Sequence, residues 1–248
     1  MDNEFKVYPS SKYVDFTAIS QIQLDRLQKK TLTAVEIGAF KGNTVAQLHQ
    51  RYGNAIQLYP IEACPLNFRY LKERFRKFKN VKLRNIAISD VDGKEKFYTI
   101  KRDPDEKNLS SEANSLYESF LKNKAWAVNY KQIEVPSQTL TTFCKNENID
   151  QIDFLKLNCE GGEYRIFSRR KLPFLKKVSI LDIAIHGKNR QFLSLEFIRK
   201  KYHINERLVS YGFKLICGYD LNDLSYIPIN HVRQIWIRKN APWKNNRK

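Results

Sequence analysis

The segment from Asp153 to Tyr164, DFLKLNCEGGEY, changes abruptly from apolar residues to a polar cluster. The cluster holds the amide of Asn158 and the carboxylates of Glu160 and Glu163. A carboxylate can accept the proton of a reacting hydroxyl group, and an amide can orient a ligand through neutral hydrogen bonds. The cluster is therefore a candidate catalytic site. The competing interpretation is that the glutamates only stabilise the positive end of a following helix.

A histidine closes a second apolar run, VSILDIAIH at 178–186, directly before Gly187. Histidine is a common general base because its pKa lies near neutrality. Ligands of open α/β sheets bind beyond the carboxyl ends of the strands, so His186 and the cluster at 158–163 would face the same mouth. His186 is thus a candidate general base, and the alternative is a structural histidine at a strand end.

Two glycines and a glutamate form another constellation nearer the N-terminus. In VEIGAFKGNT at 35–44, Gly38 permits a tight turn, and Gly42 opens the next helix near its positive end. The spacing differs from GxGxxG and from GxxxxGK[ST]. Glu62 follows about twenty residues later, where a carboxylate can accept hydrogen bonds from both ribose hydroxyls of a nucleoside. Together these residues predict a nucleoside-containing ligand, whereas Glu62 alone would also suit an exposed strand end.

Alternating strand and helix patterns must position these residues. Apolar β-rich runs predict strands at 33–39, 55–63, 81–89, 94–102, 130–140, 152–158, 178–186, 213–220 and 231–239. Helical spacing and boundary residues predict helices at 19–30, 42–53, 65–78, 139–148 and 194–212. This alternation implies βαβ units and a mainly parallel sheet. A polar stretch breaks the rhythm and predicts a surface insertion over 103–130.

Length, composition and net charge limit the class of protein. The chain has 248 residues, 42% of them hydrophobic, which suits one domain over 1–248, with residues 1–30 as an N-terminal helical cover. The four cysteines show no disulfide or zinc-ligand pattern, and no signal peptide or membrane span is predicted, so we expect a cytoplasmic protein. The net charge of +18 would suit a nucleic-acid partner, but compositional drift toward lysine would spread the same charge over solvated faces.

Six segments stand in a specific order along the chain. They are VEIGAFKGNT (35–44), IEACPLNFRYL (61–71), NIAISDVDGKEKFY (85–98), SQTLTTF (137–143), IDFLKLNCEGGEYRIF (152–167) and ILDIAIHG (180–187). Together they resemble the FkbM-type S-adenosylmethionine-dependent methyltransferases over about residues 33–187. The resemblance implies an α/β, class I Rossmann-like methyltransferase fold, with a mainly parallel seven-stranded sheet flanked by helices. It also implies S-adenosyl-L-methionine as cofactor, S-adenosyl-L-homocysteine as product, and O-methylation of sugars or other small hydroxylated metabolites.

The resemblance assigns roles to individual residues. Those expected to cradle the methionine part of the cofactor are Glu36, Gly38, Ala39 and Gly42. Glu62 would hold the ribose, and Asn85 and Ala87 would lie near the adenine. Asn43, Ala63 and Asn158 complete the cofactor-binding set that the resemblance implies.

Two positions depart from the family pattern. Asn158 stands where the family usually has an aspartate in a DxEGxE pattern, and Ala184 stands where a glutamate generally precedes the histidine by two residues. Asn158 can only donate and accept neutral hydrogen bonds. A divalent metal is therefore neither assigned nor excluded, and Glu160, Glu163 and His186 remain the acid–base candidates.

We expect an S-adenosylmethionine-dependent O-methyltransferase that acts on a hydroxyl of a sugar, a glycan or a glycosylated small molecule. The insertion 103–130 and the region after residue 186 would shape the acceptor pocket, where Trp126 and Tyr130 could stack on a sugar face. One alternative is an RNA 2′-O-methyltransferase, motivated by the charge of +18 but lacking the usual aspartate at position 158. The other is a catalytically inactive, cofactor-binding partner subunit. Oligomeric state is left open.

Overall fold

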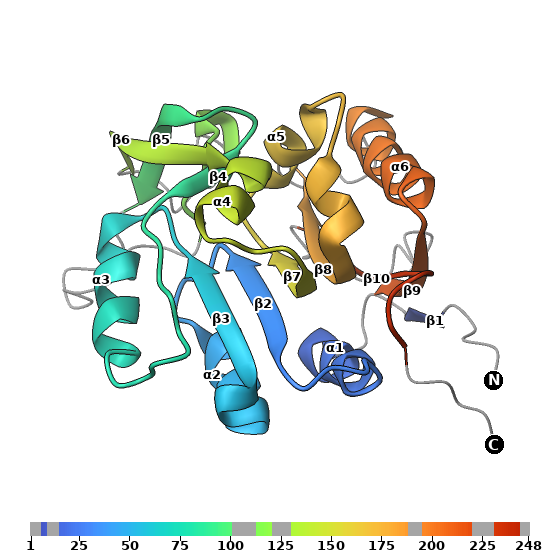
Figure 1. Ribbon diagram of the computed structural model, residues 1–248. Coiled ribbons are helices and arrows are strands. Elements are labelled where there is room, and N and C mark those ends of the chain that lie inside the picture. Colours follow the sequence, from blue (N-terminus) through green and yellow to red (C-terminus); the bar gives the residue numbers. More distant parts are fainter. Residues whose placement is uncertain are drawn as a thin grey trace, which may run out of the picture.

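The computed structural model is an α/β protein built around one large sheet (Figure 1). The structure describes residues 6–8, 15–100, 113–120, 130–187, 195–219 and 231–243. The large sheet contains, from one edge to the other, β1 (Lys6–Tyr8), β9 (Phe213–Tyr219), β10 (His231–Arg238), β8 (Val178–His186), β7 (Ile152–Leu157), β2 (Leu32–Ile37) and β3 (Ile56–Ile61). A small sheet contains β4 (Ala87–Ser89), β6 (Tyr130–Thr139) and β5 (Gly93–Ile100), in that order.

The large sheet is mainly parallel, as the alternation of strands and helices predicted. The pairs β1–β9, β8–β7, β7–β2 and β2–β3 are parallel, and only β10 runs antiparallel to its two neighbours. Parallel neighbours end at the same edge of a sheet. The carboxyl ends of β3, β2, β7 and β8 therefore lie side by side, and the predicted residues Gly38, Glu62 and Asn158 directly follow three of them.

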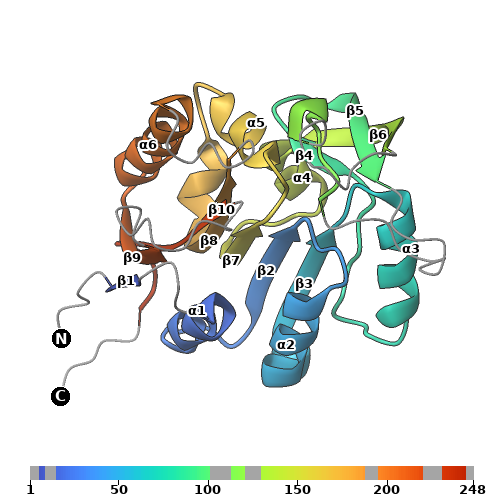
Figure 2. The same cartoon turned by 180° about the vertical axis from the view of Figure 1, so that it is seen from behind.

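Helices cover both faces of the large sheet, as the views from the front and from behind show (Figures 1 and 2). They are α1 (Phe16–Asp25), α2 (Asn43–Tyr52), α3 (Pro65–Arg74), α4 (Leu140–Asn146), α5 (Gly162–Ser168) and α6 (Leu195–Ser210). Successive side chains of a strand point to opposite faces. Accordingly, Val35 and Leu155 pack in one apolar cluster with residues of α4, α5 and α6, whereas Ala34 and Phe154 pack in another with residues of α1, α2 and α3.

The predicted helices 19–30, 42–53, 65–78, 139–148 and 194–212 correspond to α1, α2, α3, α4 and α6. The predicted N-terminal cover is α1, which contacts β7, β8 and β10. Within the described ranges, no helix combines the length and the apolar character that crossing a membrane requires.

The predicted strand 81–89 is the main departure from the expected sheet. Val81 and Arg84 form only isolated bridges with Leu58 and Ile61 of β3, and the chain then enters the small sheet as β4. Pro60 explains the break, because it has no N–H to donate across a regular parallel ladder at this position. Its carbonyl still accepts the Arg84 N–H at 3.0 Å. The large sheet consequently has six strands of full length, and the short edge strand β1 is its seventh member.

Candidate active site

A cavity of about 350 Å³ lies beyond the carboxyl ends of β2, β3 and β7. The two sheets share its walls, because Phe97 of β5 and Leu116 of the small-sheet side line it together with residues of the large sheet. The lining residues are Ile37, Gly38, Phe40, Ile61, Glu62, Ala63, Asn67, Ile86, Ala87, Ile88, Phe97, Asn114, Leu116, Asn158, Cys159 and Glu160. Apolar walls interrupted by a few polar groups suit a nucleoside-containing ligand.

The predicted site residues fall into two groups. Those that line the cavity are Gly38, Glu62, Ala63, Ala87, Asn158 and Glu160. Those that do not line it are Glu36, Ala39, Gly42, Asn43, Asn85, Glu163 and His186. The direct ligand contacts expected for the second group stay predictions, and several of these residues have other partners in the structure.

Gly38 makes the sharp turn that closes β2 at the cavity. Its φ of +82° lies in the left-handed region, and a Cβ atom there would meet the Asn158 carbonyl oxygen at 2.0 Å. The Gly38 N–H donates to the Ile61 carbonyl at 3.0 Å, and the Asn158 N–H donates to the Ile37 carbonyl at 3.0 Å. Gly38 thus lets the ends of three neighbouring strands meet closely enough to form one wall.

Gly42 serves packing between helices rather than the cavity wall. Its φ is +73°, and a Cβ atom there would meet the Phe75 ring at 2.4 Å and the Leu71 side chain at 2.8 Å. Asn43, the first residue of α2, accepts a hydrogen bond from Arg74 on its side-chain oxygen at 3.0 Å. Both residues therefore join α2 to the helix that follows β3.

Glu62 places a buried carboxylate in the cavity wall directly after β3. Its two oxygens accept hydrogen bonds from the backbone N–H groups of Phe40 and Cys64, each at 2.9 Å. Burial raises the pKa of Glu62 to about 7, although the bonds from Cys64, Phe40 and Asn67 favour the charged form. Glu36 adds a smaller upward contribution. The carboxylate is thus rigidly held where the ribose was predicted to bind.

Asn85 supports this wall from behind. Its side-chain amide donates to the backbone carbonyl oxygens of Glu62 at 2.8 Å and Ala63 at 3.1 Å. Asn85 therefore fixes the backbone after β3, and its neighbours Ile86 and Ala87 contribute the lining surface.

Glu36 lies beneath the cavity in a buried ion pair. Its carboxylate is 2.8 Å from the Lys156 ammonium, which also donates to the Thr44 hydroxyl. Glu36 and Lys156 are opposite each other in the β2–β7 pairing, and Thr44 lies in α2. The arrangement ties the central strands to α2 and engages one oxygen, Oε1, of the carboxylate that was expected to contact the methionine part of the cofactor.

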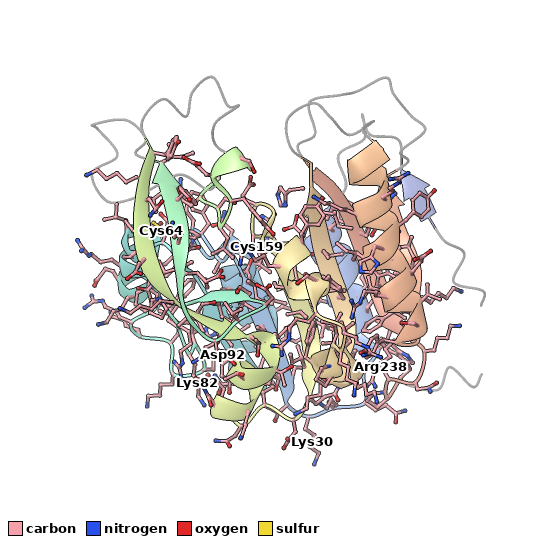
Figure 3. All side chains as sticks on the ribbon, turned by 90° about the horizontal axis from the view of Figure 1, so that it is seen from above. Lys30, Cys64, Lys82, Asp92, Cys159 and Arg238 are labelled. Atoms are coloured by element: carbon pink, nitrogen blue, oxygen red, sulfur yellow. The ribbon has the colours of Figure 1, made fainter. Side chains whose placement is uncertain are left out.

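The turn between β7 and α5 brings Asn158, Cys159 and Glu160 to the cavity. Glu160 adopts a φ of +48°, which is uncommon for a residue with a side chain. Its carbonyl accepts a hydrogen bond from the Ser115 hydroxyl at 2.6 Å, so the predicted insertion helps to hold the turn. Figure 3 shows Cys159 in the middle of the molecule, between the small sheet and α6.

Glu163 and His186 form a buried pair behind this turn. Glu163 Oε1 accepts the His186 backbone N–H at 2.6 Å and lies 3.0 Å from His186 Nδ1, while His186 Nε2 lies 3.2 Å from Glu160 Oε1. Burial disfavours the charged ring, but the carboxylates of Glu163 and Glu160 outweigh it and raise the pKa of His186 to about 10.

This geometry argues against His186 as the general base. An imidazolium at neutral pH has no lone pair with which to accept a proton, and the ring is only 1% exposed. Glu163 is also fully buried, so neither side chain lies where an acceptor could touch it. His186 does close a strand, as predicted, but the charge of its ring depends on two carboxylates that the spacing alone does not place.

The insertion contributes to the cavity as far as the structure describes it. Asn114 and Leu116 line the wall, and Ser115 pairs with Tyr98 of β5. Tyr130 begins β6, donates a hydrogen bond to Glu118 at 2.6 Å and does not line the cavity, while Trp126 lies outside the described residues.

Several lining residues were absent from the predicted set. Asn67 is the clearest example, because it contributes a hydrogen bond to Glu62 from the first turn of α3. Phe97, Asn114 and Leu116 come from the small-sheet side, which no local pattern connects to the strand ends. Among the described residues, no three His, Cys, Asp or Glu side chains are arranged so that they could hold a metal ion.

Comparison with known proteins identifies the family. The model of the methyltransferase FkbM domain matches residues 36–215. No curated protein matches the sequence. Among solved structures, a candidate rRNA methylase from Clostridium thermocellum is similar with a TM-score of 0.50 and 8% identity, over 92% of this chain and 97% of that one. At this identity the likeness concerns the fold alone.

Two further solved structures are similar with lower TM-scores. The FkbM methyltransferase of Methylobacillus flagellatus KT has 13% identity and a TM-score of 0.47, over 93% of this chain. This chain spans only 46% of the length of that protein. Fibrillarin from Aeropyrum pernix, in complex with S-adenosyl-L-methionine, has 11% identity and a TM-score of 0.46, over 86% of this chain and 68% of that one. Because the family model covers most of the chain, the protein belongs to the FkbM family of S-adenosylmethionine-dependent methyltransferases.

Proposed function

We propose that the protein transfers a methyl group from S-adenosyl-L-methionine to a hydroxyl of a sugar, a glycan or another small hydroxylated molecule. The observation that carries this proposal is the cavity in which Glu62 stands on one wall and Asn158 and Glu160 on another. A fixed carboxylate suits the ribose of the cofactor. A neutral amide beside a second carboxylate suits the hydroxyl groups of an acceptor.

The residues present fit the cofactor. Glu62 has both oxygens oriented by backbone N–H groups at 2.9 Å, so its remaining lone pairs can accept ribose hydroxyls without rearrangement. Ile86, Ile88 and Phe97 offer an apolar surface for an adenine ring. When bound, the cofactor supplies a sulfonium methyl group, whose S–C bond breaks with its electron pair on sulfur as the acceptor oxygen forms the new C–O bond. The chain must therefore align the acceptor and take up its proton.

RNA is the second candidate acceptor, and the net charge of +18 is the observation that favours it. If RNA is the acceptor, the affinity of the protein for RNA should fall steeply as the salt concentration rises, because phosphate contacts release counterions. A small sugar acceptor would show little salt dependence.

Titration calorimetry tests the proposal first. The wild-type protein should bind S-adenosyl-L-methionine and S-adenosyl-L-homocysteine, and Glu62→Ala should weaken this binding by about 1.5–3 kcal/mol, the usual loss of a charge-assisted hydrogen-bonding partner. Unchanged affinity in Glu62→Ala would refute the assignment of the ribose site. The exposed Glu73, with 76% of its side chain accessible, provides the matched control Glu73→Ala.

An acceptor screen then separates the candidates. Methyl-labelled cofactor is incubated with sugars and glycans in one series and with capped RNA in another, each at low and high salt. Label in the first series supports the proposal, and label confined to RNA supports the second candidate. Cofactor binding with no transfer to any acceptor would favour an inactive partner subunit.

A further inference from the structure

Three side chains beside the cavity form a continuous row of charge. Glu160 comes from the turn after β7, His186 from the end of β8, and Glu163 from α5. The His186 ring lies between the two carboxylates, 3.2 Å from Glu160 Oε1 on one side and 3.0 Å from Glu163 Oε1 on the other. The row runs from a fully buried carboxylate to one that lines the cavity.

The two ends of the row have different surroundings. Glu163 is 0% exposed, and its second oxygen accepts the Gly161 N–H at 3.0 Å and faces the Cys159 thiol at 3.5 Å. Glu160 has 16% of its side chain exposed and belongs to the cavity wall. Glu163 is therefore the fixed anchor of the row, and Glu160 is the end that a ligand can reach.

Other elements hold the backbone of His186. The Tyr164 hydroxyl donates to the His186 backbone carbonyl, and His231 of β10 stands opposite His186 in the strand pairing. Among the described residues, the carboxylates of Glu163 and Glu160 lie within 3.2 Å of the two ring nitrogens. Their negative charges are the reason that the ring is cationic despite its burial.

Only three cavity-lining side chains in the described part of the chain carry a titratable group, namely Glu62, Cys159 and Glu160. Glu62 lies after β3, and its remaining lone pairs are assigned to the ribose hydroxyls of the proposed cofactor rather than to the acceptor. Burial and the neighbouring Glu163 raise the pKa of the Cys159 thiol well above its ordinary value, so it stays neutral. Glu160 is the remaining candidate to receive an acceptor proton.

We propose that Glu160 is the catalytic residue that accepts the proton of the acceptor hydroxyl, and that His186, anchored by Glu163, is a positioning residue that holds Glu160 toward the cavity. The proposal rests on the proposed methyl transfer. Beyond that function, it assigns different roles to the three side chains: Glu160 takes up the proton, and His186 keeps both of its ring protons.

The proton balance is simple. The acceptor O–H bond breaks, its proton passes to a Glu160 carboxylate oxygen, and the oxygen electron pair becomes available for the new C–O bond. The imidazolium keeps both ring protons, so Glu160 alternates between carboxylate and carboxylic acid. The proton then leaves Glu160 for solvent, which reaches this side chain because it is partly exposed.

Nuclear magnetic resonance of ¹⁵N-labelled histidine tests the row without any acceptor. The chain has four histidines, and His186→Gln assigns the resonance of interest. We expect the wild-type His186 ring to stay doubly protonated at pH 8. Glu160→Gln and Glu163→Gln should each lower its titration midpoint by about one to three pH units, the usual effect of removing one adjacent opposite charge. A wild-type midpoint near the ordinary histidine value would overturn the proposal.

Methyl transfer tests the catalytic role. The assay supplies methyl-labelled cofactor and an extract of cellular glycans and polar metabolites. Glu160→Gln should lower the transfer rate by about a hundredfold or more, the usual contribution of a general base, while cofactor affinity by calorimetry stays at the wild-type value. Glu206→Gln, on the exposed surface of α6, is the matched control and should transfer at the wild-type rate.

The pH profile separates positioning from a purely structural role. In His186→Gln, Glu160 loses its cationic neighbour and binds a proton more tightly, so the acidic limb of the rate profile should move to higher pH. The proposal is overturned if the acidic limb of folded His186→Gln does not shift. It is also overturned if Glu160→Gln keeps a transfer rate within about threefold of wild type, because one general base usually contributes at least a hundredfold. Absent cofactor binding in the wild type would instead refute the proposed function, and no label transfer by the wild type would overturn both.

Discussion

Glu62→Gln should change how the folding stability of the protein depends on pH. Burial raises the pKa of Glu62 from 4.5 to about 7. Between these two values the folded protein holds a proton on Glu62 that the unfolded chain has released. The corresponding stability is complete below pH 4.5 and is lost as pH rises through 7.

The size of this effect follows from the two pKa values. The difference between 7 and 4.5, at about 1.36 kcal/mol per unit, gives an upper value of about 3.4 kcal/mol. Glutamine carries no titrating group, so the variant lacks this loss. Its amide replaces one acceptor oxygen, which costs about 1 kcal/mol through a lost backbone hydrogen bond, and this cost is the same at every pH.

Urea unfolding at a series of pH values measures the effect. The free energy of unfolding of Glu62→Gln, minus that of the wild type, should rise by up to about 3 kcal/mol between pH 4.5 and pH 8. Glu73→Gln is the matched control, since 76% of that side chain is exposed, and its difference from wild type should be nearly flat with pH. A flat difference for Glu62→Gln as well would refute the reasoning that this carboxyl holds its proton in the folded protein.

Three further predictions concern neighbouring residues. Adenosine, which carries the ribose without the methionine groups, should bind about tenfold more weakly at pH 6 than at pH 8 by calorimetry, because Glu62 is mostly protonated at the lower pH. Gly38→Ala should lower the free energy of unfolding by more than about 3 kcal/mol, because the added methyl meets the Asn158 carbonyl and the backbone is left-handed. Gly53→Ala, where φ is +53° but a Cβ would have no neighbour within 4 Å, should cost less, about 1–3 kcal/mol from backbone strain alone, in the same urea assay. Lys156→Met should lower the free energy of unfolding by about 3–5 kcal/mol, because it leaves Glu36 buried without its cation. The double variant with Glu36→Gln should regain part of that loss. A Lys156→Met variant more stable than wild type would contradict the ion-pair assignment.

Local sequence patterns were sufficient to predict where the strands end and that the residues after them come together. The run 152–158 became β7, and both Glu160 of the following turn and Glu62 after β3 line the same cavity. These predictions succeeded because parallel strands bring their carboxyl ends together regardless of the loops between them.

The charge state of the site could not be predicted in the same way. The spacing of Glu160 and Glu163 does not show that Glu160 takes a left-handed φ of +48°, or that the two carboxylates lie at opposite nitrogens of one histidine ring. The residues of the opposing wall could not be predicted either, since Phe97 and Leu116 line the cavity from the small-sheet side. Pro60, by contrast, was visible in the predicted strand 55–63 and could have indicated the interrupted pairing with residues 81–84.

The small sheet packs on an apolar cluster of its own, formed by Cys64, Ala87, Phe97, Leu116 and Val135, separate from the two larger clusters on the faces of the main sheet. It lies at the upper left of Figure 1, above α3 and α4. A unit with few buried apolar partners opens at a lower free energy than the rest of a protein. Amide hydrogens of β5 and β6 should therefore exchange with deuterium sooner than those of β7 and β8. A ligand held between the two sheets would slow that exchange first, so the rate of exchange in β5 would report occupancy of the cavity before any product is formed.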